Sequence, residues 1–228
     1  MQALELDSDA NVQRLLRKLA KLRKRAGMVR DLDVLTGYVA SLDIRGEEDC
    51  LVQLLEYLGS ERNRRSQQLH SFVVKHGESL SRRLKRTGRH LKTASQDATA
   101  SESAPGNTML SELRLQRELT APVRLTSKNL HPYRLQVKEL RYMLEMEKDP
   151  ADEELIKILG GVKDAIGEWH DWQELLTIAR ENLHHASKCK LIPLLQRTTQ
   201  QKLKHALAVA NAGRKHMQRS PAAIHRIV

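Results

Sequence analysis

Residues 130–145 read LHPYRLQVKELRYMLE. Apolar side chains recur every three or four positions in this stretch, which is the spacing that places them on one face of an α-helix. Pro132 fits the first turn of such a helix, because the N–H that proline lacks would have no partner there. We therefore predict a helix over residues 132–147. Its apolar side consists of Val137, Leu140, Met143 and Leu144.

Helical spacing of apolar residues also predominates on both sides of this stretch. One pattern covers residues 12–22, and a longer one begins near Glu47 and runs to Val73, with Gly59 as a candidate interruption. No alternation of apolar and polar residues competes with these assignments, so we expect an all-α fold. Further helices are predicted over residues 79–92, 109–120, 151–180 and 190–217.

A short motif occurs twice in the chain. Residues 27–35 read GMVRDLDVL and residues 167–175 read GEWHDWQEL, 140 positions apart (167 minus 27). Between the copies, residues 93–108 read TASQDATASESAPGNT, a composition typical of a flexible polar linker. We therefore expect a single domain of two pseudo-symmetric, antiparallel helical bundle halves with long helices. The halves are predicted at residues 1–92 and 109–228.

The first half is predicted to be incomplete at its N-terminus. The helix over residues 132–147 precedes the second copy of the motif, and the position 140 residues before His131 would lie ahead of Met1. Either the first half has lost the equivalent helix, or the chain begins after the start of the natural protein.

Two residue pairs of the motif have expected structural roles. Asp31 and Asp171 are interpreted as acids that orient an Arg or Lys by a charge-assisted hydrogen bond, rather than as catalytic groups. Gly27 and Gly167 are interpreted as positions of close helix contact or of a helix break. The tryptophans of the second copy are expected to pack in the core or at its rim.

The chain is strongly basic. It has 39 Lys and Arg against 28 Asp and Glu, a formal net charge of +11 and a pI near 9.8. A charge of this size favours anionic partners. Aromatic residues make up only 3% of the chain, so rings on which single-stranded bases could stack are scarce.

The sequence also predicts a cytoplasmic location. Cys50 and Cys189 lie far apart without metal-binding spacing, so reduced thiols are expected. The N-terminus begins with acidic residues where a secretory signal would carry positive charge, and no run of about 18 apolar residues predicts a membrane span.

Four residues of the predicted helix form a candidate anion site. At 100° per residue, His131, Arg134, Lys138 and Arg141 fall within an arc of about 80°. The start of the helix adds free backbone N–H groups and the positive end of the helix dipole, which attract phosphate. Arg binds phosphate oxygens in pairs and Lys supplies a mobile charge. The alternative is an ordinary solvated face with ion pairs to Glu139 and Glu145.

Two further regions are basic in blocks. Residues 11–30 contain no acid, and residues 62–92 contain ten Lys or Arg against Glu78 alone. A helical bundle could gather these faces onto one surface. The additional anion-binding residues predicted from these blocks are Arg14, Arg17, Lys18, Lys21, Arg30, Arg62 and Arg65.

The stretch LHPYRLQVKELRYMLE resembles the signature helix of the CHAD family, the conserved-histidine α-helical domains, and the two motif copies are similar to that family's paired downstream motifs. The resemblance covers nearly the whole chain. It implies two pseudo-symmetric helical bundles around a basic channel that binds inorganic polyphosphate. His131, Arg134, Lys138 and Arg141 match the phosphate-binding positions of the family motif one by one. The sequence departs from the family pattern in lacking a first copy of this helix upstream of Val12.

Binding without turnover is the preferred interpretation. The sequence contains no glycine-rich phosphate loop and no ExExK pattern, and the groups expected to face phosphate are cations rather than Mg²⁺-binding carboxylates. We therefore expect no enzymatic activity, no catalytic residue and no cofactor. A metal site is not expected either, because His184 and His185 lack the spacing of metal ligands.

The expected partner is inorganic polyphosphate, with polyphosphate granules as a candidate location. Two alternatives stay open: sequence-independent binding of duplex DNA, which needs phosphate contacts but no aromatic residues, and a role as accessory domain of a phosphate-polymer enzyme. Nucleic acid is the less favoured partner, and no membrane is expected to be involved.

Overall fold

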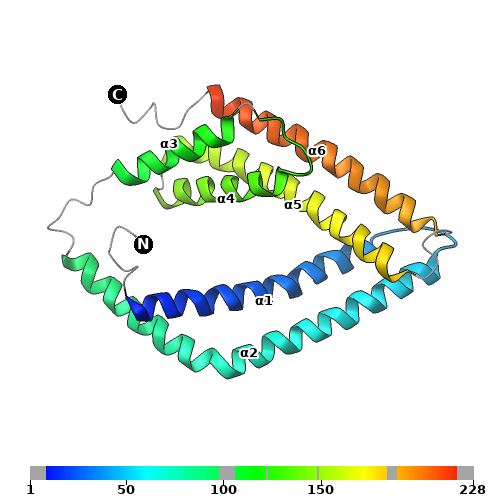
Figure 1. Cartoon of the computed structure of the whole chain (residues 1–228), viewed down its shortest axis with the longest axis horizontal. Helices are drawn as coiled ribbons and strands as arrows, with labels where there is room; N and C mark the ends of the chain where they lie inside the picture. Colours follow the sequence, from blue (N-terminus) through cyan, green and yellow to red (C-terminus); the bar gives the residue numbers. More distant parts are fainter. Residues whose placement is uncertain (1–8, 98–105, 122, 148, 184–188, 220–228) are drawn as a thin grey trace. The chain divides into compact units, whose positions relative to one another are not determined.

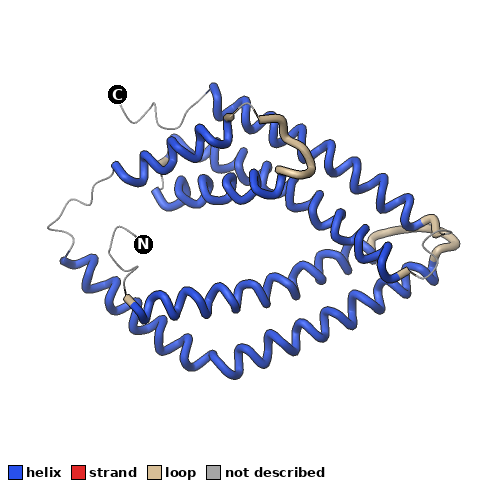
Figure 2. The backbone as a smooth tube through the Cα atoms, in the orientation of Figure 1, coloured by secondary structure: helices blue, strands red, loops and turns tan. Residues whose placement is uncertain are grey.

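The computed structural model describes residues 9–97, 106–121, 123–147, 149–183 and 189–219 (Figure 1). Within these ranges the regular structure is helical and no strand occurs, which confirms the predicted all-α fold (Figure 2). The helices are α1 (Ala10–Ala40), α2 (Glu48–Asp97), α3 (Gly106–Thr120), α4 (Leu130–Glu147), the 3₁₀ turn η4 (Pro150–Asp152), α5 (Glu153–Asn182) and α6 (Leu191–Arg219).

The helices of the first part of the chain are longer than predicted. α1 extends well beyond residues 12–22 and includes the first copy of the repeated motif. α2 runs without interruption through Gly59, so the predicted break there is wrong. A glycine inside a helix costs about 1 kcal/mol relative to alanine, and a long helix that is already nucleated tolerates this cost.

The linker prediction is wrong at both ends. α2 continues to Asp97 and α3 begins at Gly106, so parts of the segment 93–108 are helical. The Thr, Ser, Asp, Asn and Gly residues at these ends have low helix propensity, but extending an already nucleated helix costs little. The centre of the segment, residues 98–105, lies outside the described residues.

The chain separates into two compact units, Met1–Ala104 and Pro105–Val228. The first contains α1 and α2, and the second contains α3 to α6.

In the first unit, α1 and α2 form an antiparallel hairpin. The side chain of Asn11, near the start of α1, donates a hydrogen bond to Thr87 Oγ1 in the later part of α2 (3.1 Å). Seven residues further along α1, Lys18 Nζ donates a hydrogen bond to Ser79 Oγ (3.0 Å). A small apolar cluster lies between these helices and consists of Leu15, Phe72 and Leu80, with Leu22 packed against it.

The second unit has a larger core, centred on α5. α4 and α6 both pack on α5, and α3 contacts α4 and α6. α6 lies close to α5 at Gly213, where a Cβ would lie 2.8 Å from Val162 Cγ2. Trp169 and Trp172 of α5 are buried, which confirms the packing role predicted for them. The core also includes Leu130, Val137, Leu140, Leu144, Leu155, Leu159, Ile166, Ala206 and Ala210.

One cation of the second unit belongs to its framework. Arg214 of α6 donates from Nε to the backbone oxygen of Leu119 (3.1 Å) and from Nη1 to that of Val123 (2.8 Å). These bonds satisfy carbonyls at and just beyond the end of α3, which have no partner inside the helix. The same guanidinium lies 5.5 Å from the ring centroid of Tyr133, whose pKa is raised because the phenol is buried.

Candidate functional site

α4 carries the four residues that the sequence predicted as an anion site. Its buried side packs into the core through Tyr133, Val137, Leu140 and Leu144. His131 is exposed, whereas Arg134, Lys138 and Arg141 are half-buried. We call these four residues the α4 cation row.

The α4 cation row lies along α5 in a regular antiparallel register. The rings of His131 and His170 are 5.5 Å apart between centroids. Three positions further along α4, Arg134 lies against Gly167, which is three positions earlier in α5. Seven positions beyond Arg134, Arg141 lies near Gly160, seven positions before Gly167. Both arginines therefore lie opposite glycines that share their spacing.

Gly167 provides the space that the Arg134 guanidinium occupies. A Cβ built on Gly167 would lie 3.0 Å from Arg134 Nη2 and 3.4 Å from Nε. The sequence predicted close helix contact or a break at this glycine. The structure shows a contact, and its partner is a guanidinium. The corresponding space at Gly160 is wider, with Arg141 Nη1 4.0 Å from the position of a Cβ.

Hydrogen bonds hold the two arginines in different ways. Arg134 Nε donates to the backbone oxygen of Lys163 (3.0 Å), which uses one of the five N–H groups of the guanidinium. Arg141 forms an ion pair with Glu145, one turn later in α4. Glu145 is one of the two acids, with Glu139, that the alternative interpretation of α4 as an ordinary solvated face named as ion-pair partners.

The other three members of the α4 cation row, His131, Arg134 and Lys138, have no acidic ion-pair partner among the described residues. Within the described residues, neither His131 nor Lys138 forms an ion pair, and Glu139 pairs with none of the four. α5 adds the exposed ring of His170 and the ammonium of Lys163, which pairs with its neighbour Asp164 (2.7 Å). The site is therefore cationic overall, with Glu145 paired to Arg141 of the α4 cation row and Asp164 paired to Lys163 of α5.

The cations predicted in the first unit have mixed surroundings. Arg30 pairs with Asp31 (3.1 Å), so Asp31 does orient an arginine, its own neighbour in the chain. Arg65 approaches Glu61 at 3.6 Å, and Arg62 pairs with Asp33. These acids reduce the positive charge that the three arginines offer to a ligand.

The predicted cations nearer the start of α1 have no acidic partner among the described residues. Arg14, Arg17 and Lys21 are exposed. Arg17 Nε donates to the carbonyl of Gln13 in its own helix (3.3 Å), and Lys18 is held by Ser79 of α2. The structure thus keeps this part of the basic block on the surface of the hairpin.

Sequence reasoning missed the α5 side of the site. Gly160, Lys163 and His170 were not proposed as site residues, although each lies opposite the α4 cation row or accepts from it. One signal was available in the sequence. The spacing of seven between Gly160 and Gly167 equals that between Arg134 and Arg141.

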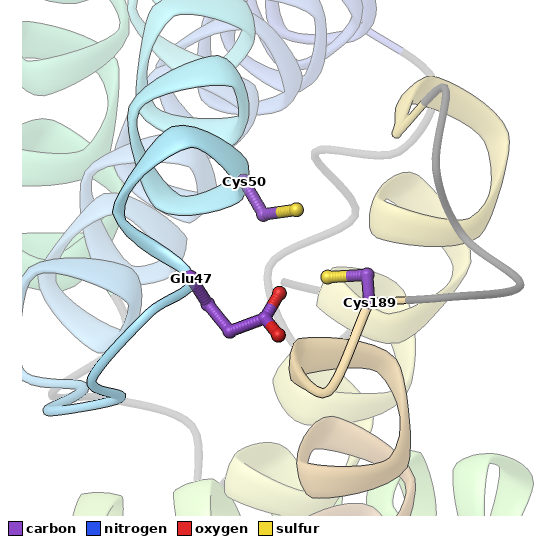
Figure 3. A group of neighbouring side chains, drawn as sticks. All are labelled: Glu47, Cys50 and Cys189. Carbon is purple, nitrogen blue, oxygen red and sulfur yellow. The ribbon is translucent and has the colours of Figure 1, made fainter.

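The two cysteines belong to different units and form no disulfide in the described structure. Cys50 lies in the first turn of α2, close to Glu47 (Figure 3). The backbone oxygen of Glu47 accepts a hydrogen bond from Leu51 N (3.0 Å). Cys189 lies directly before α6 (Figure 3). His184 and His185, for which no metal-binding role was predicted, lie outside the described residues.

The fold and the site together define an all-helical protein whose second unit presents a row of cations on one helix. The family model of the CHAD domain matches residues 4–180, which is more than half of the chain. The chain therefore belongs to the CHAD domain family, as the resemblance of the signature helix predicted. No curated protein and no solved structure matches it. Among the described helices, none combines the length and apolar character needed to cross a membrane.

Proposed function

We propose that this protein binds inorganic polyphosphate, without turning it over, through the α4 cation row and the adjoining edge of α5. The observation that carries the proposal is the arrangement of Arg134, Lys138 and Arg141 along one helix, with a single acid paired to them. Arg134 and Arg141 are seven positions apart, which at 1.5 Å per residue is about 10 Å along the helix axis. A chain of phosphates can contact such a row at several points, whereas a single phosphate ion cannot.

The local geometry favours tight contacts. Arg134 is held by the carbonyl of Lys163 and by the space over Gly167, so it loses less side-chain entropy when a ligand binds. Its remaining N–H groups can bind two phosphate oxygens at once. Lys138 lies between the two arginines in sequence, and its flexible side chain can place the ammonium against different phosphates of the ligand. Membership of the CHAD family supports the same ligand.

The chemistry of the site supports binding rather than phosphoryl transfer. Such transfer normally requires carboxylates that hold Mg²⁺ against the phosphates. At the α4 cation row the attached acid is Glu145, and it is paired with Arg141. A protein that binds polyphosphate in this way is expected in the cytoplasm with polyphosphate granules, and we include that location in the proposal.

A competition titration with two double variants tests the proposal. Labelled polyphosphate is displaced by unlabelled polyphosphate or duplex DNA at equal phosphate concentration and moderate salt. The test variant is Lys138→Gln with Arg141→Gln. The control is Arg197→Gln with Lys204→Gln, which removes two exposed cations seven positions apart on α6. Each positioned cation–phosphate contact contributes about 1.5–3 kcal/mol, so the test variant should lose on the order of a hundredfold in affinity and the control much less.

Two results would contradict the proposal. Displacement by DNA as effective as by polyphosphate would assign the surface to nucleic acid. Equal losses in the two double variants, with helicity unchanged by circular dichroism, would show that binding responds to total charge and not to position. Glutamine keeps helix propensity, so a loss of fold is not expected in either variant.

A further inference from the structure

The first unit contains a groove of its own between α1 and α2. Lys21 and Arg25 line it from α1, and Ser71, Phe72, Lys75 and His76 line it from α2. We call these six residues the hairpin groove. It lies entirely within the unit Met1–Ala104 and shares no residue with the α4 cation row. Of its residues, only Lys21 was proposed from the sequence.

The charge of the hairpin groove is mostly uncompensated. None of its lining residues is acidic. One further lining cation, Arg64, is neutralised by Glu61, which accepts from its Nε (2.8 Å) and Nη2 (2.6 Å). Lys21 and Lys75 are exposed and form no ion pair with the described residues. Two ammonium groups, one from each helix, are therefore available to an anion in the groove.

Aromatic contacts fix the base of the groove. The guanidinium of Arg25 lies 4.8 Å from the centroid of the Phe72 ring, a cation–π arrangement that holds the charge in place. The ring of His76 meets Phe72 edge to face, with centroids 4.6 Å apart. Ser71 adds a hydroxyl that can donate to a phosphate oxygen. The groove thus combines held and mobile cations with a neutral donor.

His76 reports the electrostatic potential of the groove. Its pKa is lowered mainly by partial burial, and further by Lys18, Lys75, Lys21 and Arg25. These four cations come from both helices that pack around the ring. Three of them, Lys21, Arg25 and Lys75, line the groove, so an anion bound there would replace their repulsion of an imidazolium by attraction.

We propose that the hairpin groove is a second, separate binding site for a short linear oligophosphate, such as tripolyphosphate or the end of a longer chain. The inference rests on the proposed polyphosphate function for the chemistry of its ligand, but not for its location. Cations from two helices suit several linked phosphates better than one. A DNA duplex is much wider than a groove between two neighbouring helices, so it is the less suitable occupant.

Calorimetric titration of the full chain with tripolyphosphate tests the site. The variant Lys21→Gln with Lys75→Gln should bind at least about tenfold more weakly, because two positioned charge contacts are lost. The matched control, Arg23→Gln with Lys24→Gln, removes two exposed cations of α1 that do not line the groove. It should change affinity by less than about twofold. Equal losses in the two folded variants would overturn the proposal.

A second measurement follows His76 itself by NMR titration. Saturating tripolyphosphate should raise the pKa of His76, because the bound anion stabilises the imidazolium against Lys18, Lys21, Arg25 and Lys75. The rise should persist in the variant Lys138→Gln with Arg141→Gln. An unchanged pKa of His76 at saturating tripolyphosphate would overturn the proposal that the hairpin groove binds oligophosphate. A different result is that the α4 variant binds long-chain polyphosphate as tightly as the unsubstituted protein while the pKa of His76 still rises. That result would contradict the proposed function of the α4 cation row and support the proposed site in the hairpin groove.

Discussion

The glycines of the two motif copies have different surroundings. In α5, Gly167 is covered by the guanidinium of Arg134, and a Cβ there would meet it at 3.0 Å. In α1, a Cβ on the equivalent Gly27 would meet nothing within 4 Å. The difference arises because α4 packs along α5, whereas the described helix beside α1 in its unit is α2. A motif shared by both halves therefore acquires its role from the helix packed against it.

A similar contrast separates one pair of equivalent leucines, whereas another pair, Leu35 and Leu175, is buried in both helices. Leu159 of α5 is 0% exposed, whereas Leu19, the residue 140 positions earlier in α1, is 36% exposed. The core around α5 includes residues of α3, α4 and α6, while the cluster beside α1 has three buried members. Leu19 and Leu159 should therefore differ in what they contribute to stability.

The largest expected effect separates these two leucines. Leu159→Ala removes a fully buried side chain and should lower the free energy of unfolding by about 2–5 kcal/mol. Leu19→Ala should lower it by about 1 kcal/mol or less, because little burial is lost and alanine favours the helix. Urea unfolding followed by circular dichroism measures both. Similar losses for the two variants would show that α1 is covered as fully as α5.

The next effect concerns binding and compares the two glycines. Gly167→Ala should push Arg134 away from α5 and break its bond to the carbonyl of Lys163, weakening polyphosphate binding by roughly three- to tenfold. The Cβ added by Gly27→Ala lies in open space, so this variant should bind polyphosphate as before, and α1 should be slightly more stable. Polyphosphate titration and thermal unfolding of both variants provide the measurements.

The stability of the Gly167→Ala variant decides how its binding loss is interpreted. The clashing atoms belong to the end of a long side chain, so the protein can adapt and its unfolding temperature should change little. Weaker binding with unchanged stability identifies Gly167 as a positioning residue for Arg134. Unchanged binding would show that Arg134 keeps its contacts from another rotamer.

Helix type and the α4 cation row were predictable from local sequence. Periodic leucines define the helices, and the spacing of His131, Arg134, Lys138 and Arg141 places them on one side whatever α4 packs against. The length of α2 was not predictable in the same way. Glycine weakens a helix locally, and only the packing of the whole element decides whether it continues.

The partners of the site residues depend on register, which local sequence does not contain. The position of Gly167 beneath Arg134 follows from how α4 lies along α5, 33 positions away in the chain (167 minus 134). The pairing of Arg62 with Asp33 likewise depends on how α1 and α2 align. The hairpin groove also depends on this alignment. Lys21 and Lys75 line the same groove only because α1 and α2 pack together.

The smallest expected effect lies at the starts of the two helices. Asp9 caps α1 by accepting from the backbone N–H groups of Asn11 and Val12 (3.3 Å for Val12), whereas Asp152 at the start of α5 makes no such bond. The pKa of Asp9 is lowered chiefly by the bond from Asn11 N, with further contributions from Val12 and His90.

The capping contribution of Asp9 should therefore depend on pH. Because its folded pKa is below the unfolded value of 3.8, the stabilisation is present above pH 3.8 and is lost as pH falls through the lower, folded value. Asp9→Ala should lower the unfolding temperature by a few degrees at neutral pH. Asp9→Asn should keep most of the cap, since asparagine caps as well as aspartate, but its contribution should not fall in acid. Thermal unfolding of the three proteins at pH 7 and near pH 3 measures both effects. If Asp9→Ala matches the unsubstituted protein at pH 7, the bonds to Asp9 do not stabilise α1, and this part of the contrast between the two helices disappears.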